Sequence, residues 1–287
     1  MKRGLILGGG GVLGLAWEIG LLHGLCDAGI DLAGADEVIG TSAGAFAGAA
    51  LLDHRGIAWA YQRQIAASVR EVAVASSGNV IERLTEILGQ CAGDDREAGR
   101  RIGAFSMNAS TVDQRVRLAV VRERLDREDW PSGRLTFTAV DVDSGELHLL
   151  RRDSAMDLVH AAAASGAAPG IWPVVDANGR LWVDGGSVSV TNAHLAHRFD
   201  ECIVISPRPT NLTGVPVQAE IDGCGKRGRA LLIVPDSRSE VAIGQNNFDP
   251  VRRRVAAEAG HQQGLHYSSE VANSWRVVRA MSEVGTT

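Results

Sequence analysis

Residues 37–52 of the chain read EVIGTSAGAFAGAALL. A short apolar run leads into GTSAG at residues 40–44, and an alanine-rich run leads out of it. This order predicts a strand, a sharp turn that carries Ser42, and a helix. Gly40 and Gly44 flank the serine, as a nucleophile elbow requires, because strand and helix come close together there. The turn would expose the Ser42 hydroxyl at a helix N-terminus, where backbone N–H groups favour negative charge.

The residues before the elbow complete an α/β opening. Residues 3–7 predict a buried strand, a glycine loop follows at 8–11, and residues 15–28 carry apolar side chains at helical spacing. Strand, loop, helix, strand, elbow and helix imply a parallel sheet with right-handed crossovers. Taken alone, the elbow also fits an ordinary serine in a glycine-rich turn, so the neighbouring motifs decide its interpretation.

The glycine loop has two interpretations. Gly9, Gly11 and Gly14 match G-x-G-x-x-G, the pattern of a dinucleotide-binding loop. Asp31 lies at the distance where that fold places an acid, but it does not close the second strand, which ends in the serine elbow instead. Consecutive glycines also expose backbone N–H groups, which suits an oxyanion hole that binds charge developing on a carbonyl oxygen.

A third stretch, VDGG at residues 183–186, ends a short predicted strand over 180–183. An acid at a strand end followed by two glycines can project into a cleft, although an aspartate beside glycine is also common in plain turns. Ser42, the glycine loop and Asp184 would then supply a nucleophile, oxyanion donors and a base. All three lie at predicted C-terminal ends of strands, where open α/β sheets place their sites.

The composition limits the class of protein. The chain has 287 residues, of which 45% are hydrophobic, and this is enough for one α/β domain with a large core. Its net charge is −5 and it has no basic arm, so nucleic acid is not expected as a partner. The cysteines lie far apart without CxxC spacing, which indicates reduced thiols and a cytoplasmic protein: Cys26, Cys91, Cys202 and Cys224. Four histidines show no ligand spacing, so neither a metal site nor a cofactor is expected: His23, His54, His148 and His160.

No secretory or membrane-spanning segment is predicted. Residues 4–17 are apolar and follow two basic residues, but six of these fourteen residues are glycine and no Ala-x-Ala cleavage pattern follows. Residues 158–175 are weakly charged, but Ser165-Gly166 and Pro169-Gly170 interrupt them.

A mainly helical insertion at about 53–128 interrupts the alternation of strands and helices. A glycine- and charge-rich stretch at 91–103 predicts a mobile loop within it. The insertion either forms a lid, with residues 76–110 gating a site at the strand ends, or covers one face of the sheet. The expected helices lie at 53–75, 80–88 and 111–127, the last capped by Thr111.

The remaining elements follow without repeats or linkers. We therefore expect one domain over residues 1–287, with its core motifs in 3–206 and a C-terminal extension over about 207–287. The expected elements are strands at 135–142, 146–150, 201–206 and 229–234, helices at 153–164 and 249–260, and a loop at 214–228.

Five segments together resemble the patatin-like phospholipase family. They occur in that family's order and cover about the first 200 residues: GGGGVLGLAWEIGLLHGL, GTSAG, TAVDVDSGEL, AAAASGAAPGIWPVV and VDGG. The resemblance implies a three-layer αβα fold with a mainly parallel central sheet and a helical cap. No segment after Ser206 contributes to it.

The resemblance also implies a serine lipid acyl hydrolase of the phospholipase A, lysophospholipase or esterase type, which acts on acyl-ester lipids without a metal. Ser42 would be the nucleophile and Asp184 the base of a dyad. Asp is a poor base at its ordinary pKa of about 3.9, so burial must raise that pKa. The oxyanion N–H groups would come from Gly9, Gly10, Gly11 and Val12. The residues that support the elbow and the acidic motif would be Gly40, Gly44, Gly185 and Gly186.

Three features depart from the family pattern. Leu13 stands where many relatives have Arg or Lys, so any head-group role of that charge is absent. Asn192 is followed by Ala193-His194 instead of the family's frequent Asn-x-Pro. The insertion does not match closely, which leaves the choice of substrate open. A lipid hydrolase would contact a membrane surface transiently as a peripheral protein, although no strongly amphipathic basic helix is present.

Two other functions compete with this interpretation. The first is a Ser-His-Asp esterase, because four histidines follow Asp184 in the order that such a triad needs: His194, His197, His261 and His266. None of them lies in a recognisable loop context. The second is a catalytically silent protein that binds acyl chains or a nucleotide.

Overall fold

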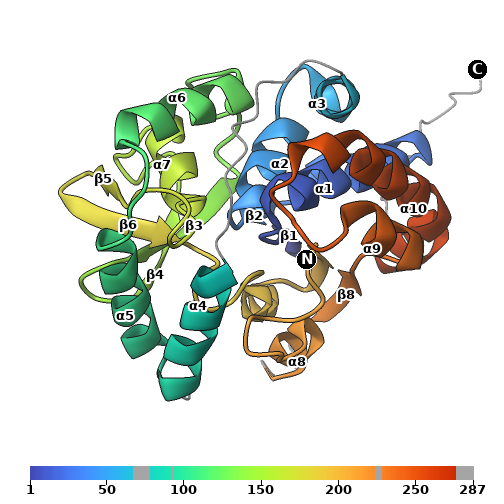
Figure 1. Cartoon of the computed structure of the whole chain (residues 1–287). Coiled ribbons are helices and arrows are strands. Elements are labelled where there is room, and N and C mark those ends of the chain that lie inside the picture. The colour runs from blue at the N-terminus through green and yellow to red at the C-terminus, as the bar shows by residue number, and fades with distance from the viewer. Residues whose placement is uncertain (67–77, 92, 224–227, 276–287) are drawn as a thin grey trace, which may run out of the picture.

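The computed structural model describes residues 1–66, 78–91, 93–223 and 228–275 (Figure 1). Its strands are β1 (Arg3–Leu7), β2 (Glu37–Gly40), β3 (Leu135–Asp141), β4 (Leu147–Leu150), β5 (Val175–Ala177), β6 (Arg180–Asp184), β7 (Glu201–Ile205) and β8 (Arg229–Ile233). Its α-helices are α1 (Gly11–Asp27), α2 (Ala43–Leu51), α3 (Gly56–Ile65), α4 (Gly78–Cys91), α5 (Asp95–Met107), α6 (Gln114–Leu125), α7 (Leu158–Ser165), α8 (Val217–Asp222), α9 (Ser237–Ile243) and α10 (Arg253–Ser274). Short 3-10 helices lie at η1 (Leu32–Gly34), η2 (Ala193–Arg198) and η3 (Pro250–Arg252).

One central sheet organises these elements. Its strand order is β5-β6-β3-β2-β1-β7-β8, with β4 paired to β3. Neighbours from β3 through β2, β1 and β7 to β8 run parallel, whereas β4 and β6 are antiparallel to β3. The predicted α/β class with a mainly parallel sheet is therefore confirmed.

Alternating side chains give the sheet two buried faces. In β1, Leu5 and Leu7 join the large core under α1, α2 and α10, whereas Ile6 faces a second cluster under η2 and α8. Because successive side chains on a strand point to opposite faces, helices must cover both sides. The result is three layers, with α1, α2 and α10 gathered away from α4 and α5 in Figure 1.

The last long helix, α10, packs along α1. Gly20 and Gly24 of α1 meet Gly260 and Gly264 of α10, so each helix presents a G-x-x-x-G row to the other. A Cβ at Gly24 would lie 2.1 Å from the carbonyl oxygen of His261. The helices therefore touch backbone to backbone, as small-residue interfaces allow. Residues after 206 supply β8 and α10 to the same sheet and core.

The described part of the insertion is more ordered than its composition predicted. The mobile loop expected at 91–103 is wrong, because α5 covers most of it. Asp94 caps this helix by accepting the Glu97 N–H at 3.0 Å. Gly99 permits close packing instead of mobility, since its Cβ would lie 2.5 Å from the Gly145 carbonyl oxygen in the hairpin turn. Within the insertion, α5 covers β3 and β6, so this part serves the sheet face.

Several element boundaries also differ from the predictions. Helix α1 begins at Gly11 instead of residue 15, and α8 forms inside the loop expected at 214–228. Asp113, not Thr111, caps α6, because its carboxylate accepts the Arg115 N–H at 2.8 Å. Helix α7 begins at Leu158 instead of residue 153, and the Asp157 carboxylate caps it by accepting the His160 N–H. The described residues do not include the later part of the helix expected at 53–75 or residues 76–77, which follow it. They also do not include Cys224.

None of the described helices combines the length and the apolar character that a membrane crossing requires. Cys26, Cys91 and Cys202 are free thiols.

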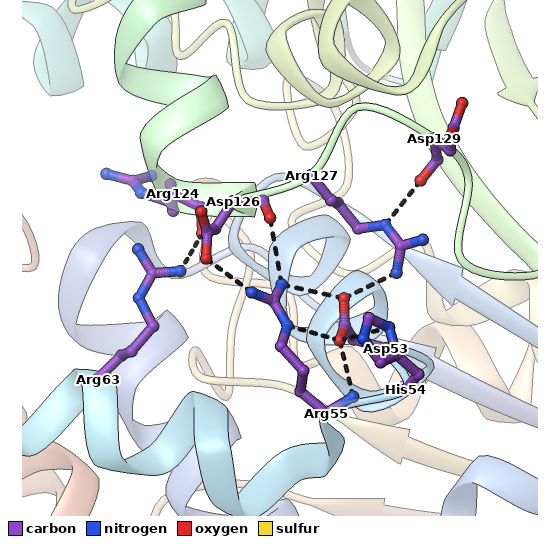
Figure 2. Close-up of polar contacts among 8 residues, drawn as sticks. All are labelled: Asp53, His54, Arg55, Arg63, Arg124, Asp126, Arg127 and Asp129. Carbon is purple, nitrogen blue, oxygen red and sulfur yellow. Dashed lines mark hydrogen bonds and ion pairs between the residues drawn. The ribbon is translucent and has the colours of Figure 1, made fainter.

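A polar cluster fastens the end of α6 to the segment between α2 and α3 (Figure 2). The buried Asp53 carboxylate accepts Arg55 Nε at 2.9 Å and Arg127 Nη1 at 2.7 Å. Arg55 Nη1 also donates to Asp126 Oδ2 at 2.6 Å. Burial alone would raise the pKa of Asp53, but the hydrogen bonds from Arg55 and Arg127 outweigh it and hold that pKa well below its usual range.

We predict that Asp53→Asn lowers the free energy of unfolding at pH 7 by about 2–4 kcal/mol, because two arginines lose a buried partner. A depressed pKa stabilises the fold above the ordinary aspartate pKa, so the difference between the variant and the wild type should shrink as pH falls. Urea unfolding at pH 7 and at lower pH measures it. Asp129→Asn is the matched control, because only the backbone oxygen of Asp129 accepts Arg127 and its carboxyl is exposed. Equal losses for both variants would contradict the prediction.

Candidate active site

The serine elbow is a strained turn between β2 and α2. Ser42 has φ 53° and ψ −111°, a conformation that non-glycine residues rarely adopt. Helix α2 leaves the turn against β1, where a Cβ on Gly44 would lie 2.1 Å from the Leu7 carbonyl oxygen. Gly40 is the last residue of β2. The predicted strand, turn and helix are confirmed.

Ser42 and Asp184 meet across the sheet. Ser42 Oγ donates a hydrogen bond to Asp184 Oδ2 at 2.7 Å. Asp184 is the last residue of β6, a strand end as predicted, and this strand runs antiparallel to β3. It reaches the elbow because β3 runs past the end of β2: Gly40 pairs with Phe137, whereas Asp184 pairs with Ala139 further along.

Neighbouring polar groups fix both side chains. The Ser42 N–H donates to Ser165 Oγ at 3.0 Å, at the C-terminal end of α7. Asn192 Nδ2 donates to Thr41 Oγ1 at 3.1 Å and to the Gly185 carbonyl oxygen at 3.0 Å, so one amide joins the elbow to the acidic motif. The Gly186 N–H donates to Asp184 Oδ1 at 2.7 Å. Asn192 makes these contacts even though the residues after it, Ala193 and His194, depart from the Asn-x-Pro pattern.

The Asp184 carboxyl is poised to exchange a proton near neutral pH. Burial raises its pKa to about 6, against the lowering effects of the Ser42 hydrogen bond, the Gly186 N–H and the Arg117 charge. Arg117 comes from α6 and is itself buried, with Nη2 2.9 Å from the Gly166 carbonyl oxygen and its guanidinium 4.3 Å from the Trp172 ring centre.

The glycine loop lies beside Ser42, with one correction to its expected role. The Gly9 N–H already donates to the Val190 carbonyl oxygen at 2.7 Å, so Gly9 is wrong as an oxyanion donor. Gly10 is the N-cap of α1, and Gly11 and Val12 are its first two residues. Within the described residues no backbone hydrogen bond from these three N–H groups is found. The first N–H groups of a helix lack partners inside the helix, so these three are available to an anion. Leu13 points into the main core.

Ser42, Asp184 and the glycine loop line one pocket. Its lining includes Gly10 and Gly11, and a second recess beside Ser42 adds Val12. Two side chains of α4, Ile81 and Leu84, form part of its wall, so this part of the insertion borders the site. The other wall residues include Arg208, Leu212 and residues 245–248.

None of the described residues lining the pocket is a histidine. The four histidines after Asp184 have other neighbours. His194 Nδ1 lies 3.9 Å from Glu220 Oε2, His261 Nε2 bonds to Asp27 Oδ2, and His197 and His266 contact backbone carbonyl oxygens.

Sequence reasoning missed Arg117, Ser165 and Arg208. Ser165 was visible within the segment AAAASGAAPGIWPVV, but its hydrogen bond to the Ser42 N–H depends on the packing of α7. Arg117 lies on a predicted helix with several arginines, and no periodic pattern marks it as the buried one. Arg208 follows β7 in a segment without a motif.

Comparisons with known proteins identify a family. The family described as patatin-like phospholipase matches residues 5–197. The crystal structure of VipD from Legionella pneumophila has 13% identity and a TM-score of 0.45, and the match covers 94% of this chain and 67% of that one. The type III effector ExoU has 15% identity and a TM-score of 0.39, covering 93% of this chain and 53% of that one, so this chain spans about half its length. The comparison with curated proteins found no match.

We predict that Ser42→Ala raises the pKa of Asp184 above its value of about 6, because the variant loses a hydrogen bond that favours the carboxylate. Carbon-13 NMR of protein labelled at the aspartate carboxyl carbon measures the titration. Ser268→Ala is the control, because Ser268 lies on α10 and its Oγ donates to the Leu265 carbonyl oxygen. An Asp184 titration near 4 in the wild type would show that burial does not dominate this site.

Proposed function

The chain belongs to the patatin-like phospholipase family, and we propose that it is a serine lipid acyl hydrolase whose Ser42–Asp184 dyad cleaves acyl esters. The observation that carries this proposal is the 2.7 Å hydrogen bond from Ser42 Oγ to Asp184 Oδ2 inside a pocket that also holds free backbone N–H groups. A nucleophile, a base within hydrogen-bond reach and oxyanion donors are the parts that acyl transfer requires.

The chemistry proceeds in two steps. Ser42 Oγ attacks the acyl carbonyl carbon while Asp184 accepts the hydroxyl proton, and the carbonyl electrons move onto the oxygen. The N–H groups of Gly10, Gly11 and Val12 bind that oxyanion. Collapse of the intermediate expels the alcohol, which takes the proton from Asp184 and leaves an acyl-serine. Water then attacks the acyl-serine while Asp184 accepts a proton from it. Collapse of this second intermediate releases the acid, and Asp184 returns the proton to Ser42 Oγ.

The properties of Asp184 suit this role. A general base works best when its pKa lies near the working pH, and the pKa of Asp184 is raised to about 6. At neutral pH the carboxylate is therefore mostly ionised, yet it is far more basic than an exposed aspartate. The direct bond between Ser42 and Asp184 needs no histidine between them, which favours the dyad over a Ser-His-Asp triad.

We predict that Ser42→Ala and Asp184→Asn each reduce hydrolysis of a short-chain p-nitrophenyl ester at least about 10³-fold. Alanine at His194, His197, His261 or His266 should retain activity, because none of these side chains lines the pocket. Circular dichroism establishes that each variant is folded. Loss of activity in a single histidine variant would favour the triad.

A fluorophosphonate probe separates the enzyme from a silent binding protein. The dyad predicts an adduct that mass spectrometry locates on Ser42. A folded wild-type chain that neither reacts with the probe nor hydrolyses any acyl ester would overturn the proposal.

The pocket also points to the kind of ester. Ile81, Leu84 and Leu212 give it an apolar side that suits an acyl chain. Of the described residues that line the pocket, Arg208 alone carries positive charge. Its side chain has no hydrogen bond or ion pair with any described residue, and burial lowers its pKa. A half-buried cation without an acid partner suits an anionic group of the substrate, such as a lipid phosphate.

We predict that Arg208→Gln lowers kcat/KM for a phosphatidylcholine at least about tenfold more than for a neutral p-nitrophenyl ester, because only the first substrate offers a phosphate to the guanidinium. Initial rates on mixed micelles measure both substrates. Arg238→Gln, at an exposed position of α9, is the matched control and should change neither rate. An equal loss on both substrates would assign Arg208 a structural role.

A further inference from the structure

A cluster of metal-binding residue types lies far from the pocket, at the C-terminal end of α1. His23 and Asp27 are four residues apart, so they lie on one face of this helix. His261 of α10 faces them across the close contact between the two helices. These three side chains offer two imidazoles and one carboxylate.

The ligand atoms are already close together. Asp27 Oδ2 lies 2.8 Å from His261 Nε2, and Asp27 Oδ1 lies 3.6 Å from His23 Nδ1. All the ligand atoms lie within 4.8 Å of one another. Ligands of a tetrahedral zinc ion, at bonds of about 2.0–2.2 Å, are separated by roughly 3.3–3.5 Å. Small side-chain rotations would therefore bring them to coordinating distance.

His23 lacks the partner that a buried imidazole nitrogen normally has. Its Nδ1 is buried and forms no hydrogen bond with any described residue, since the 3.6 Å separation from Asp27 is too long. An imidazole nitrogen without a hydrogen-bond partner is available to a metal ion.

The surroundings hold these groups in place. The Gly24 contact fixes the backbone of His261 against α1, and the Tyr61 ring of α3 packs against both imidazoles, with centroids 4.6 Å from His23 and 5.3 Å from His261. Asp27 is 46% exposed, so an ion can enter from solvent and water can complete its coordination. A preformed site on two packed helices reduces the ordering cost of binding.

We propose that His23, Asp27 and His261 bind one divalent transition-metal ion, best matched by Zn²⁺, and that this ion clamps α10 to α1. Imidazole and carboxylate ligands in this ratio suit zinc, with water as the fourth ligand. The clamp would lie at the opposite end of α1 from the Gly11 and Val12 N–H groups, so its role is structural. The proposal departs from the sequence-based expectation of no metal site, because His261 lies 234 residues from Asp27 and spacing along the chain cannot reveal it.

Calorimetric titration of the full chain with ZnCl₂, after treatment with EDTA and removal of any affinity tag, tests the site. We expect one Zn²⁺ per chain and a higher melting temperature with the metal. His261→Ala should weaken binding at least about 100-fold, since losing a ligand costs more than losing an outer-shell partner. His266→Ala is the matched control, because His266 lies on the same helix and its Nδ1 bonds to the Gln262 carbonyl oxygen instead of to the cluster.

A second variant tests the site in case His261→Ala does not fold. Asp27→Asn changes a half-exposed side chain, so the fold should persist while the affinity falls. Cobalt substitution of the wild type should give the visible absorption of a tetrahedral site, which Asp27→Asn should weaken. The proposal is overturned if the wild type binds no zinc, or if His261→Ala and Asp27→Asn each bind zinc as strongly as the wild type does.

Discussion

The site depends on one close approach, between the first turn of α2 and the end of β1. The 2.1 Å separation that a Cβ on Gly44 would have from the Leu7 oxygen is far below any real contact, so only glycine allows α2 to leave the sheet at this angle. The turn then forces Ser42 into a positive φ and places the amide N–H of Ser42 against Ser165. The packing around the elbow therefore compensates the backbone strain at Ser42.

Asp184 shows how strand length sets the geometry of the site. An antiparallel strand normally ends at the opposite edge of a parallel sheet from its neighbours' C-termini. Here β3 extends beyond β2, and β6 pairs with the part that extends, so its last residue stops beside the elbow. The same arrangement buries the carboxylate. Burial raises the pKa of Asp184, while three donors or charges limit the rise, and the balance near 6 leaves a carboxylate that is ionised yet basic.

Local motifs were predictable from the sequence, and long-range contacts were not. GTSAG and VDGG pointed to Ser42 and Asp184, which the structure brings within hydrogen-bond distance, because a tight turn from strand to helix accepts only small residues beside the serine. Gly99 misled the prediction for α5, since glycine in a close helix contact and glycine in a loop look alike in sequence. The role of Gly9 was also hidden in the sequence, because its N–H donates to the carbonyl oxygen of Val190, which lies 181 positions away along the chain. Arg117 could not be identified because burial of an arginine depends on which helix face meets α7 and the Trp172 ring.

Helix α1 connects the pocket beside Ser42 with the C-terminal helix α10. Its first turn borders Ser42, and its body contacts α10 through paired G-x-x-x-G rows. A helix in backbone contact with a neighbour has little freedom to tilt, because any shift brings main-chain atoms into collision. The position of the N–H groups beside Ser42 is therefore fixed by contacts with α10 as well as by the glycine loop. Residues after 206 supply none of the proposed reacting groups, yet they support the pocket in which those groups act.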